Sequence, residues 1–163
     1  MDFVRHTLRC TQKLMCCQEN NIKFQLDNPQ QKFVKLYKVD GGLISGVGIK
    51  KCDYMYEIFN QMLDIKKINA ELNDDNKSSL NIESLIYVEL KGKNFEKAAK
   101  QIEITADQLQ ARHSHCNKKL GYIVCSRIQH PKFQTVTQRL KMHFMKKYGI
   151  KLQIGVKVET LVV

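Results

Sequence analysis

A carboxylate and an ammonium lie two residues apart in segment 87–92, which reads Tyr-Val-Glu-Leu-Lys-Gly. Strand-forming residues surround the pair, and successive side chains of a strand point to opposite faces, so Glu89 and Lys91 should project together. A second carboxylate, Asp53, opens the upstream segment 52–59, which also predicts a strand. If the two strands are neighbours, the two carboxylates repel each other. That repulsion would raise a pKa, and a hard divalent cation would remove it.

This pattern resembles the PD-(D/E)xK nuclease superfamily, whose core hairpin carries an Asp followed by Glu-x-Lys and is covered by a helix. The matching residues are Asp53 and then Glu89-Leu90-Lys91, with Cys52 where the family name has proline. Thirty-six positions separate Asp53 from Glu89, so the chain must leave the sheet and return between the two strands. The resemblance implies a mixed α/β, restriction-endonuclease-like core of one helix, three antiparallel strands, a second helix and a fourth strand.

The same residues suit metal-assisted phosphodiester hydrolysis. The reaction needs a nucleophilic water, a polarised phosphoryl oxygen and stabilisation of the departing oxygen, which one or two Mg²⁺ ions can supply. Mg²⁺ prefers a few carboxylates, a carbonyl and waters, so the expected ligands are Asp53, Glu89 and the backbone carbonyl of Leu90, with Mn²⁺ able to substitute. Lys91 would orient the water or stabilise charge in the transition state.

The resemblance implies further members of the site. A polar residue on the helix after the Glu-x-Lys strand commonly reaches back toward the metal, and Gln101 occupies that place. A glutamate on the first helix is another frequent member, which points to Glu19. Asp40 has two interpretations, because Asp before Gly-Gly is ordinary turn chemistry but the residue also precedes the Asp53 strand.

Periodicity, caps and turn residues predict the elements that would position these side chains. In chain order they are a helix over 3–19, strands over 32–40, 43–47, 52–59 and 85–91, a helix over 95–109, a strand over 120–128, a helix over 133–148 and a strand over 152–159. Asn94 would cap the second helix and Gly149 would end the third. The polar segment 61–84 is expected to be an insertion, and the last helix and strand an extension, in one domain spanning 1–163.

Composition favours a polyanionic partner. The 163 residues include 27 Lys and Arg against 16 Asp and Glu, a formal charge of +11. Nucleic acid fits this charge, although a lysine-rich solvated surface has the same composition. No apolar run approaches the roughly 20 residues of a membrane-spanning helix, so no membrane association is expected. Six cysteines without an N-terminal signal peptide predict a reducing cytoplasm.

A rival metal site would be a zinc site built from the group His113, His115 and Cys116, joined by Cys125 or by the pair Cys16-Cys17. The spacing lacks the two separated ligand pairs of a standard zinc finger. A polar loop is therefore the favoured interpretation, and whether these residues bind metal stays open.

The sequence thus predicts a Mg²⁺-dependent nuclease, acting on DNA in preference to RNA, with Asp53, Glu89, Lys91 and Gln101 at its centre. Two alternatives remain open. One is a non-catalytic nucleic-acid-binding or regulatory module of the same fold, and the other is a nuclease subunit of a larger defence, restriction or mobile-element complex. Specificity, endo- or exonucleolytic action and a homodimeric or larger assembly are also left open.

Overall fold

The structure, a computed structural model, describes residues 7–10, 12–44, 48, 50–59, 82–128 and 132–163. Within these residues the chain forms two mixed sheets and two helices. The main sheet has the order β1-β4-β5-β6-β7-β8, with bounds β1 (Thr7–Cys10), β4 (Val34–Lys38), β5 (Tyr54–Phe59), β6 (Ile82–Lys91), β7 (Lys118–Cys125) and β8 (Ile150–Val156). The second sheet has the order β2-β3-β9, with bounds β2 (Leu14–Glu19), β3 (Ile22–Asp27) and β9 (Val158–Val162).

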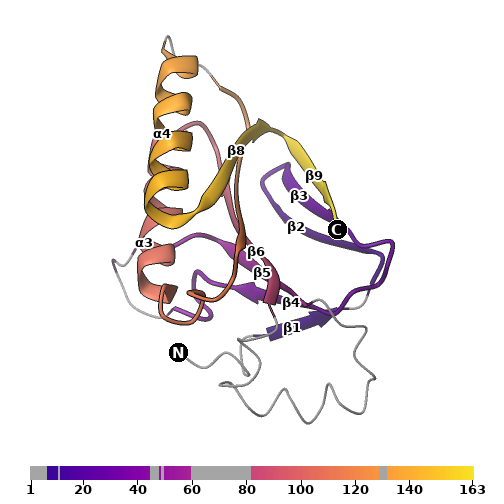
Figure 1. The fold of residues 1–163 in the computed structure, drawn as a ribbon. Coiled ribbons are helices and arrows are strands. Elements are labelled where there is room, and N and C mark those ends of the chain that lie inside the picture. Colours follow the sequence, from indigo (N-terminus) through magenta and orange to yellow (C-terminus); the bar gives the residue numbers. More distant parts are fainter. Residues whose placement is uncertain (1–6, 11, 45–47, 49, 60–81, 129–131) are drawn as a thin grey trace.

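The main sheet is covered on both faces. The helices α3 (Phe95–Leu109) and α4 (Phe133–Tyr148) pack on one face, and the second sheet packs on the other (Figure 1). Tyr87 of β6 belongs to the core under the helices, whereas Val88 and Leu90 belong to the core between the sheets. Strand alternation therefore places Glu89 and Lys91 on the helix-covered face.

The centre of the main sheet follows the expected order. Strands β4, β5 and β6 form an antiparallel meander, and α3 then leads to β7, which runs parallel to β6. Tyr54 pairs with Val88, so the two segments that carry Asp53 and Glu89 are direct neighbours. The long separation between them does not prevent pairing. The insertion expected over 61–84 is shorter than predicted, because β6 begins at Ile82, and its remainder lies outside the described residues.

The predicted helix over 3–19 is wrong wherever the structure describes that segment, which forms β1 and β2. Burial in β2 alternates, with Met15 and Cys17 inside and their neighbours more exposed. Asn20 and Asn21 both have positive φ, 45° and 64°, as in the tight turns that join hairpin strands. They reverse the chain into β3 and place Glu19 on a strand.

The last predicted strand is two strands. Lys157 has φ of 64°, a left-handed conformation that breaks the extended chain between β8 and β9. The chain thereby passes from the main sheet to the second sheet, where β9 pairs with β3 in parallel. Alternating apolar residues continue across the break, which is why the sequence predicts one strand.

Both long helices agree with the sequence. The N–H of Lys97 donates to Oδ1 of Asn94 at 2.9 Å, which caps α3, and Gly149 (φ 67°) ends α4 by donating to the carbonyl of Met145 at 3.1 Å.

No helix among the described residues is long and apolar enough to cross a membrane. The five cysteines whose side chains the structure describes are free thiols.

Candidate active site

Asp53 lies immediately before β5 and is held from two sides. Its Oδ2 accepts a hydrogen bond from the N–H of Leu90 at 2.7 Å, and its backbone carbonyl accepts one from Val39 at 2.9 Å. The first contact holds the carboxylate at the end of β6. Its donor, Leu90, is the residue between Glu89 and Lys91 in the sequence. The hairpin thus brings the separated halves of the Asp and Glu-x-Lys pattern together.

Glu89 is a fully buried carboxylate at the same place. Its Oε1 accepts from Nζ of Lys91 at 3.2 Å, and Lys91 itself is 34% exposed. Its Oε2 is buried and accepts no hydrogen bond of normal geometry from the described residues. A buried carboxylate oxygen without a partner costs free energy, so this oxygen is suited to a cation.

Both carboxyl groups have raised pKa values, and in both cases burial is the largest cause. Burial is the main cause that raises the pKa of Glu89 to about 8; the charge of Asp53 adds to it, while Lys91 and the amide of Asp53 oppose it. Burial likewise raises the pKa of Asp53 to about 6, against the hydrogen bond from Leu90. Near neutral pH the site therefore retains a proton that a bound cation would displace.

Glu19 and Asp40 lie around the outer side of Asp53. With Lys38, Gly41 and Asp53 they line a cavity of about 210 Å³. Glu19 reaches it from the end of β2, so this residue lies on a strand and not on the helix where the resemblance expected it. The charges of Glu19 and Asp40 both contribute to the raised pKa of Asp53.

Asp40 has the backbone geometry of a turn residue. It precedes Gly41, whose φ is 70°, and it forms a backbone bridge with Ile44, as a turn residue does. Its Oδ1 also pairs with Nζ of Lys51 at 3.5 Å.

Among the residues that the structure describes, no group of three or more His, Cys, Asp or Glu side chains is placed to hold a metal ion.

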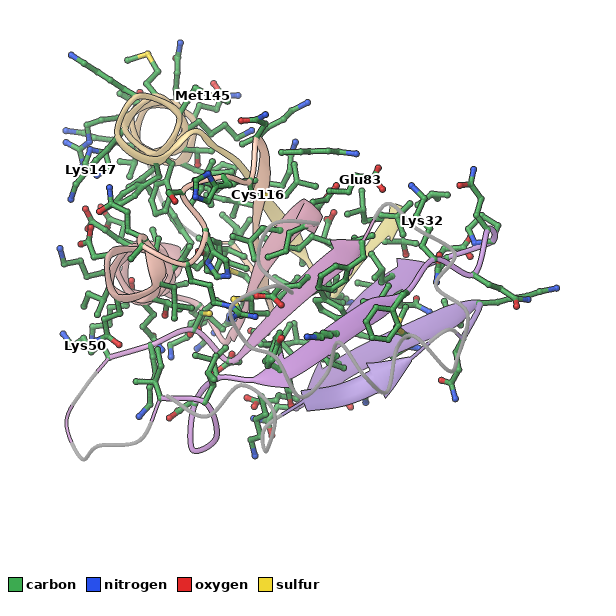
Figure 2. The ribbon with its side chains drawn as sticks, turned by 60° about the horizontal axis from the view of Figure 1, so that its bottom comes forward. Lys32, Lys50, Glu83, Cys116, Met145 and Lys147 are labelled. Carbon is green, nitrogen blue, oxygen red and sulfur yellow. The ribbon has the colours of Figure 1, made fainter. Side chains whose placement is uncertain are left out.

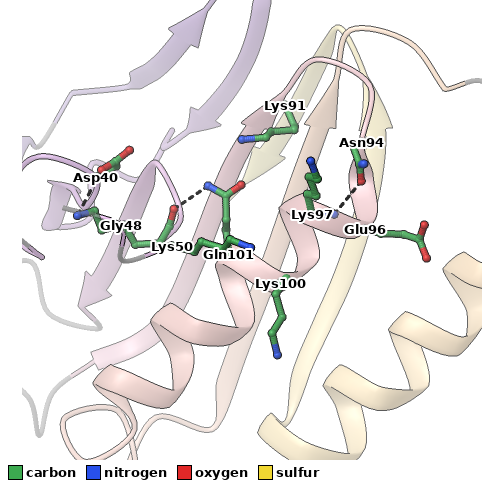
Figure 3. Close-up of a pocket in the computed structure, with 10 residues that line it drawn as sticks. Asp40, Gly48, Lys50, Lys91, Asn94, Glu96, Lys97, Lys100 and Gln101 are labelled. Carbon is green, nitrogen blue, oxygen red and sulfur yellow. Dashed lines mark hydrogen bonds and ion pairs between the residues drawn. The ribbon is translucent and has the colours of Figure 1, made fainter. Parts of the chain in front are cut away.

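Gln101 acts on the segment that leads into Asp53. Its Nε2 donates to the carbonyl of Lys51 at 2.9 Å (Figure 3). One turn further along α3, the buried Thr105 accepts the N–H of Cys52 at 2.8 Å and donates to the carbonyl of Gln101 at 2.9 Å. Helix α3 thus fixes residues 51 and 52. Sequence reasoning missed Thr105, although its i+4 spacing from Gln101 places both on one helix face.

A basic cleft opens beside Lys91 and Gln101, with a volume of about 790 Å³ (Figure 3). Five lysines line it, against the two carboxylates of Asp40 and Glu96. They are Lys50, Lys51, Lys91, Lys97 and Lys100. Because they come from the loop before β5, the end of β6 and the first half of α3, the sequence alone does not reveal that they converge.

Two residues of the rival zinc site, His113 and Cys116, have other partners within the protein. His113 is buried, with Nε2 at 3.0 Å from Oε1 of Glu57 and Nδ1 at 3.1 Å from the hydroxyl of Tyr87. Both ring nitrogens therefore have protein partners. The thiol of Cys116 faces the carbonyl of Lys118 at 3.4 Å. His113 belongs to a hydrogen-bond network around Glu57 and does not form a metal cluster with described His, Cys, Asp or Glu residues.

Comparison of the chain with known protein families, with curated proteins and with solved structures found no match. The chemical interpretation of the site therefore rests on its geometry and on the residue pattern.

Proposed function

We propose that the chain is a metal-dependent nuclease of the PD-(D/E)xK type, which hydrolyses phosphodiester bonds in DNA in preference to RNA. The observation that carries the proposal is the buried Glu89, whose Oε2 has no hydrogen-bond partner among the described residues, on the strand next to the one that follows Asp53. A buried and a half-buried carboxylate on neighbouring strands, with a lysine two residues after Glu89, support a hydrolytic site over a purely structural ion pair.

The order of the elements supports the same proposal. The antiparallel meander β4-β5-β6, followed by α3 and the parallel strand β7, matches the core expected of a restriction-endonuclease-like fold. The departure is on the N-terminal side, where β2 carries Glu19. We propose that the second sheet takes the place of the expected first helix in presenting this glutamate.

The donor set fits Mg²⁺ or Mn²⁺, because these ions prefer oxygen ligands. Asp53 and Glu89, with the carbonyl of Leu90, would hold the ion, which would supply an activated water and neutralise charge at the phosphoryl oxygens. Lys91 pairs with Glu89 and also lines the basic cleft, so its ammonium can contact a phosphate placed there. Gln101 and Thr105 are positioning residues, since they hold the segment before Asp53.

A cleavage assay tests the proposal. Full-length protein with Mg²⁺ or Mn²⁺ should cut supercoiled plasmid DNA, and EDTA should stop the reaction. Asp53→Asn and Glu89→Gln should remove cleavage, and Lys91→Ala should lower its rate about 10²- to 10³-fold, the range expected for one transition-state contact. Lys118→Ala, at an exposed lysine outside the cleft, is the control and should keep the wild-type rate.

The second candidate is a nucleic-acid-binding module without turnover. It is favoured by one observation, namely that the described residues provide two acidic ligands and no third close enough to hold a metal with them. DNA binding that persists in EDTA, together with no cleavage under any metal, would establish this alternative. A nuclease subunit that needs a partner chain would instead gain cleavage when that partner is added.

A further inference from the structure

The basic cleft offers phosphate contacts without groups free to read bases. Among the described residues, its polar amide side chains are Asn94 and Gln101. Oδ1 of Asn94 accepts the N–H of Lys97, and Nε2 of Gln101 donates to the carbonyl of Lys51 (Figure 3). Bidentate recognition of adenine needs both the oxygen and the nitrogen of such an amide. Each amide already uses one of these atoms within the protein.

The other groups that recognise bases are also missing from the described lining. Among the described residues no arginine lines the cleft, and arginine makes the commonest specific contact with guanine. The described lining also contains no aromatic side chain, whereas proteins that bind single strands stack bases on aromatic rings. The remaining charged donors are lysines, which act on phosphates as flexible point charges.

Two of these lysines are available for such contacts. Lys51, Lys91 and Lys100 each pair with a carboxylate, at 3.5, 3.2 and 2.8 Å. Lys50 and Lys97 form no ion pair with a residue that the structure describes. They come from the loop before β5 and from the first turn of α3, so they face the cleft from two different elements (Figure 3).

We propose that the cleft binds the sugar-phosphate backbone of double-stranded DNA independently of base sequence, with Lys50 and Lys97 as its principal phosphate contacts. The inference rests on the proposed nuclease function and adds to it a mode of substrate recognition. Strand-backbone contacts position the duplex beside Lys91 but carry no sequence information. The enzyme should therefore bind unrelated duplexes equally and disfavour single strands.

Fluorescence anisotropy in EDTA tests this without cleavage. The probes are three labelled 20-base-pair duplexes of unrelated sequence and one of their single strands, each titrated over a series of KCl concentrations. The three duplexes should give Kd values within about threefold of one another and tighter binding than the single strand. Each phosphate contact contributes about 0.9 to the slope of log Kd against log salt, so K50A/K97A should lower that slope by about two and weaken binding.

The matched control is K141A/K151A, which removes two exposed lysines that lie outside the cleft, on α4 and β8. It should keep the wild-type slope, and both double variants should keep the wild-type melting temperature. An unchanged slope in K50A/K97A, an equal loss in the control, a duplex bound more than tenfold tighter than the others, or preferred single-strand binding would each overturn the proposal. Cleavage that still depends on Glu89 would then leave the nuclease function standing, so the two failures can be distinguished.

Discussion

Glu89 is the central residue of the proposed metal site. Its side chain is fully buried, one oxygen pairs with Lys91, and the other has no described partner. Sequence reasoning could place Glu89 and Lys91 on one strand face, because strand periodicity is a local property. It could not show that this face is buried beneath α3, nor that the N–H of Leu90 fixes Asp53. Both depend on segments distant in sequence.

The raised pKa of Glu89 makes the metal-free protein sensitive to alkaline pH. A carboxyl with a pKa of about 8 in the folded state and an ordinary pKa of 4.5 when unfolded binds more protons in the folded state. Its contribution to stability is therefore present below about pH 4.5 and is lost as pH rises through 8. Melting temperatures of wild type in EDTA should fall over this window more steeply than those of Glu89→Gln.

Adding Mg²⁺ at pH 8 should raise the melting temperature of wild type and leave that of Glu89→Gln unchanged, because the ion replaces the lost proton. Glu96→Gln serves as the control, since Glu96 is 47% exposed in the same cleft. It should behave like wild type. Identical pH profiles of the melting temperature for wild type and Glu89→Gln would contradict a raised pKa of Glu89.

Among the elements, α3 contributes most to the site. It covers Glu89, lines the cleft with Lys97 and Lys100, and holds residues 51 and 52 through Gln101 and Thr105. The sequence predicted α3 and α4 closely, because an apolar stripe, an N-cap and a terminal glycine are local signals. The segment of β2 was wrongly predicted as part of a helix. A short strand followed by two asparagines resembles a helix end when its pairing partner β3 is unknown.

Thr105→Val should destabilise the protein by about 1–3 kcal/mol, since it leaves the N–H of Cys52 buried without its acceptor. The substitution keeps the shape of the side chain and its β-branching. Urea unfolding measures the change in the free energy of unfolding. Thr135→Val, at an exposed position of α4, is the matched control and should change that free energy by less than about 0.5 kcal/mol.

If Thr105 positions Asp53 as proposed, Thr105→Val should also weaken Mg²⁺-dependent cleavage at temperatures where the variant remains folded. Full activity together with lost stability would restrict Thr105 to a structural role.

At the scale of the whole molecule, a buried network around Glu57 joins the main sheet to the segment after α3. Tyr37 of β4 donates to Glu57 at 2.7 Å, Arg112 donates at 2.9 and 3.2 Å, and His113 lies at 3.0 Å. Burial alone would raise the pKa of Glu57, but the bonds from His113 and Arg112 outweigh it and lower the pKa to about 2. This network could not be predicted from the sequence, since Tyr37, Glu57 and Arg112 are far apart along the chain.

Glu57→Gln should cost about 3–5 kcal/mol of stability near neutral pH, because it removes the charge of a buried carboxylate that accepts from both Arg112 and His113. The lowered pKa also means that the stability supplied by Glu57 is present above about pH 4.5 and is lost as pH falls toward 2. Urea unfolding at several pH values measures both effects. Glu83→Gln, which breaks the partly exposed pair with Lys32 at 3.0 Å, should cost no more than about 1 kcal/mol.

The lysines of the surface lie in separate regions of the molecule. Lys50 lies at the edge of the molecule, whereas Lys147 and Met145 project from α4 (Figure 2). Lys147 already pairs with Glu103 at 3.4 Å and Asp107 at 3.6 Å, so part of the positive charge on α4 is compensated locally. The total charge of +11 therefore does not identify a binding surface by itself. The proposed phosphate-binding surface rests instead on the five lysines that line the basic cleft.

A crystal soaked in Mn²⁺ tests the central proposal most directly. Anomalous scattering should place an ion between the carboxylates of Asp53 and Glu89, next to the carbonyl of Leu90, and crystals of Glu89→Gln soaked in the same way should lack it. Wild-type crystals that bind Mn²⁺ only elsewhere, or not at all at saturating concentration, would contradict a metal-dependent nuclease at this site.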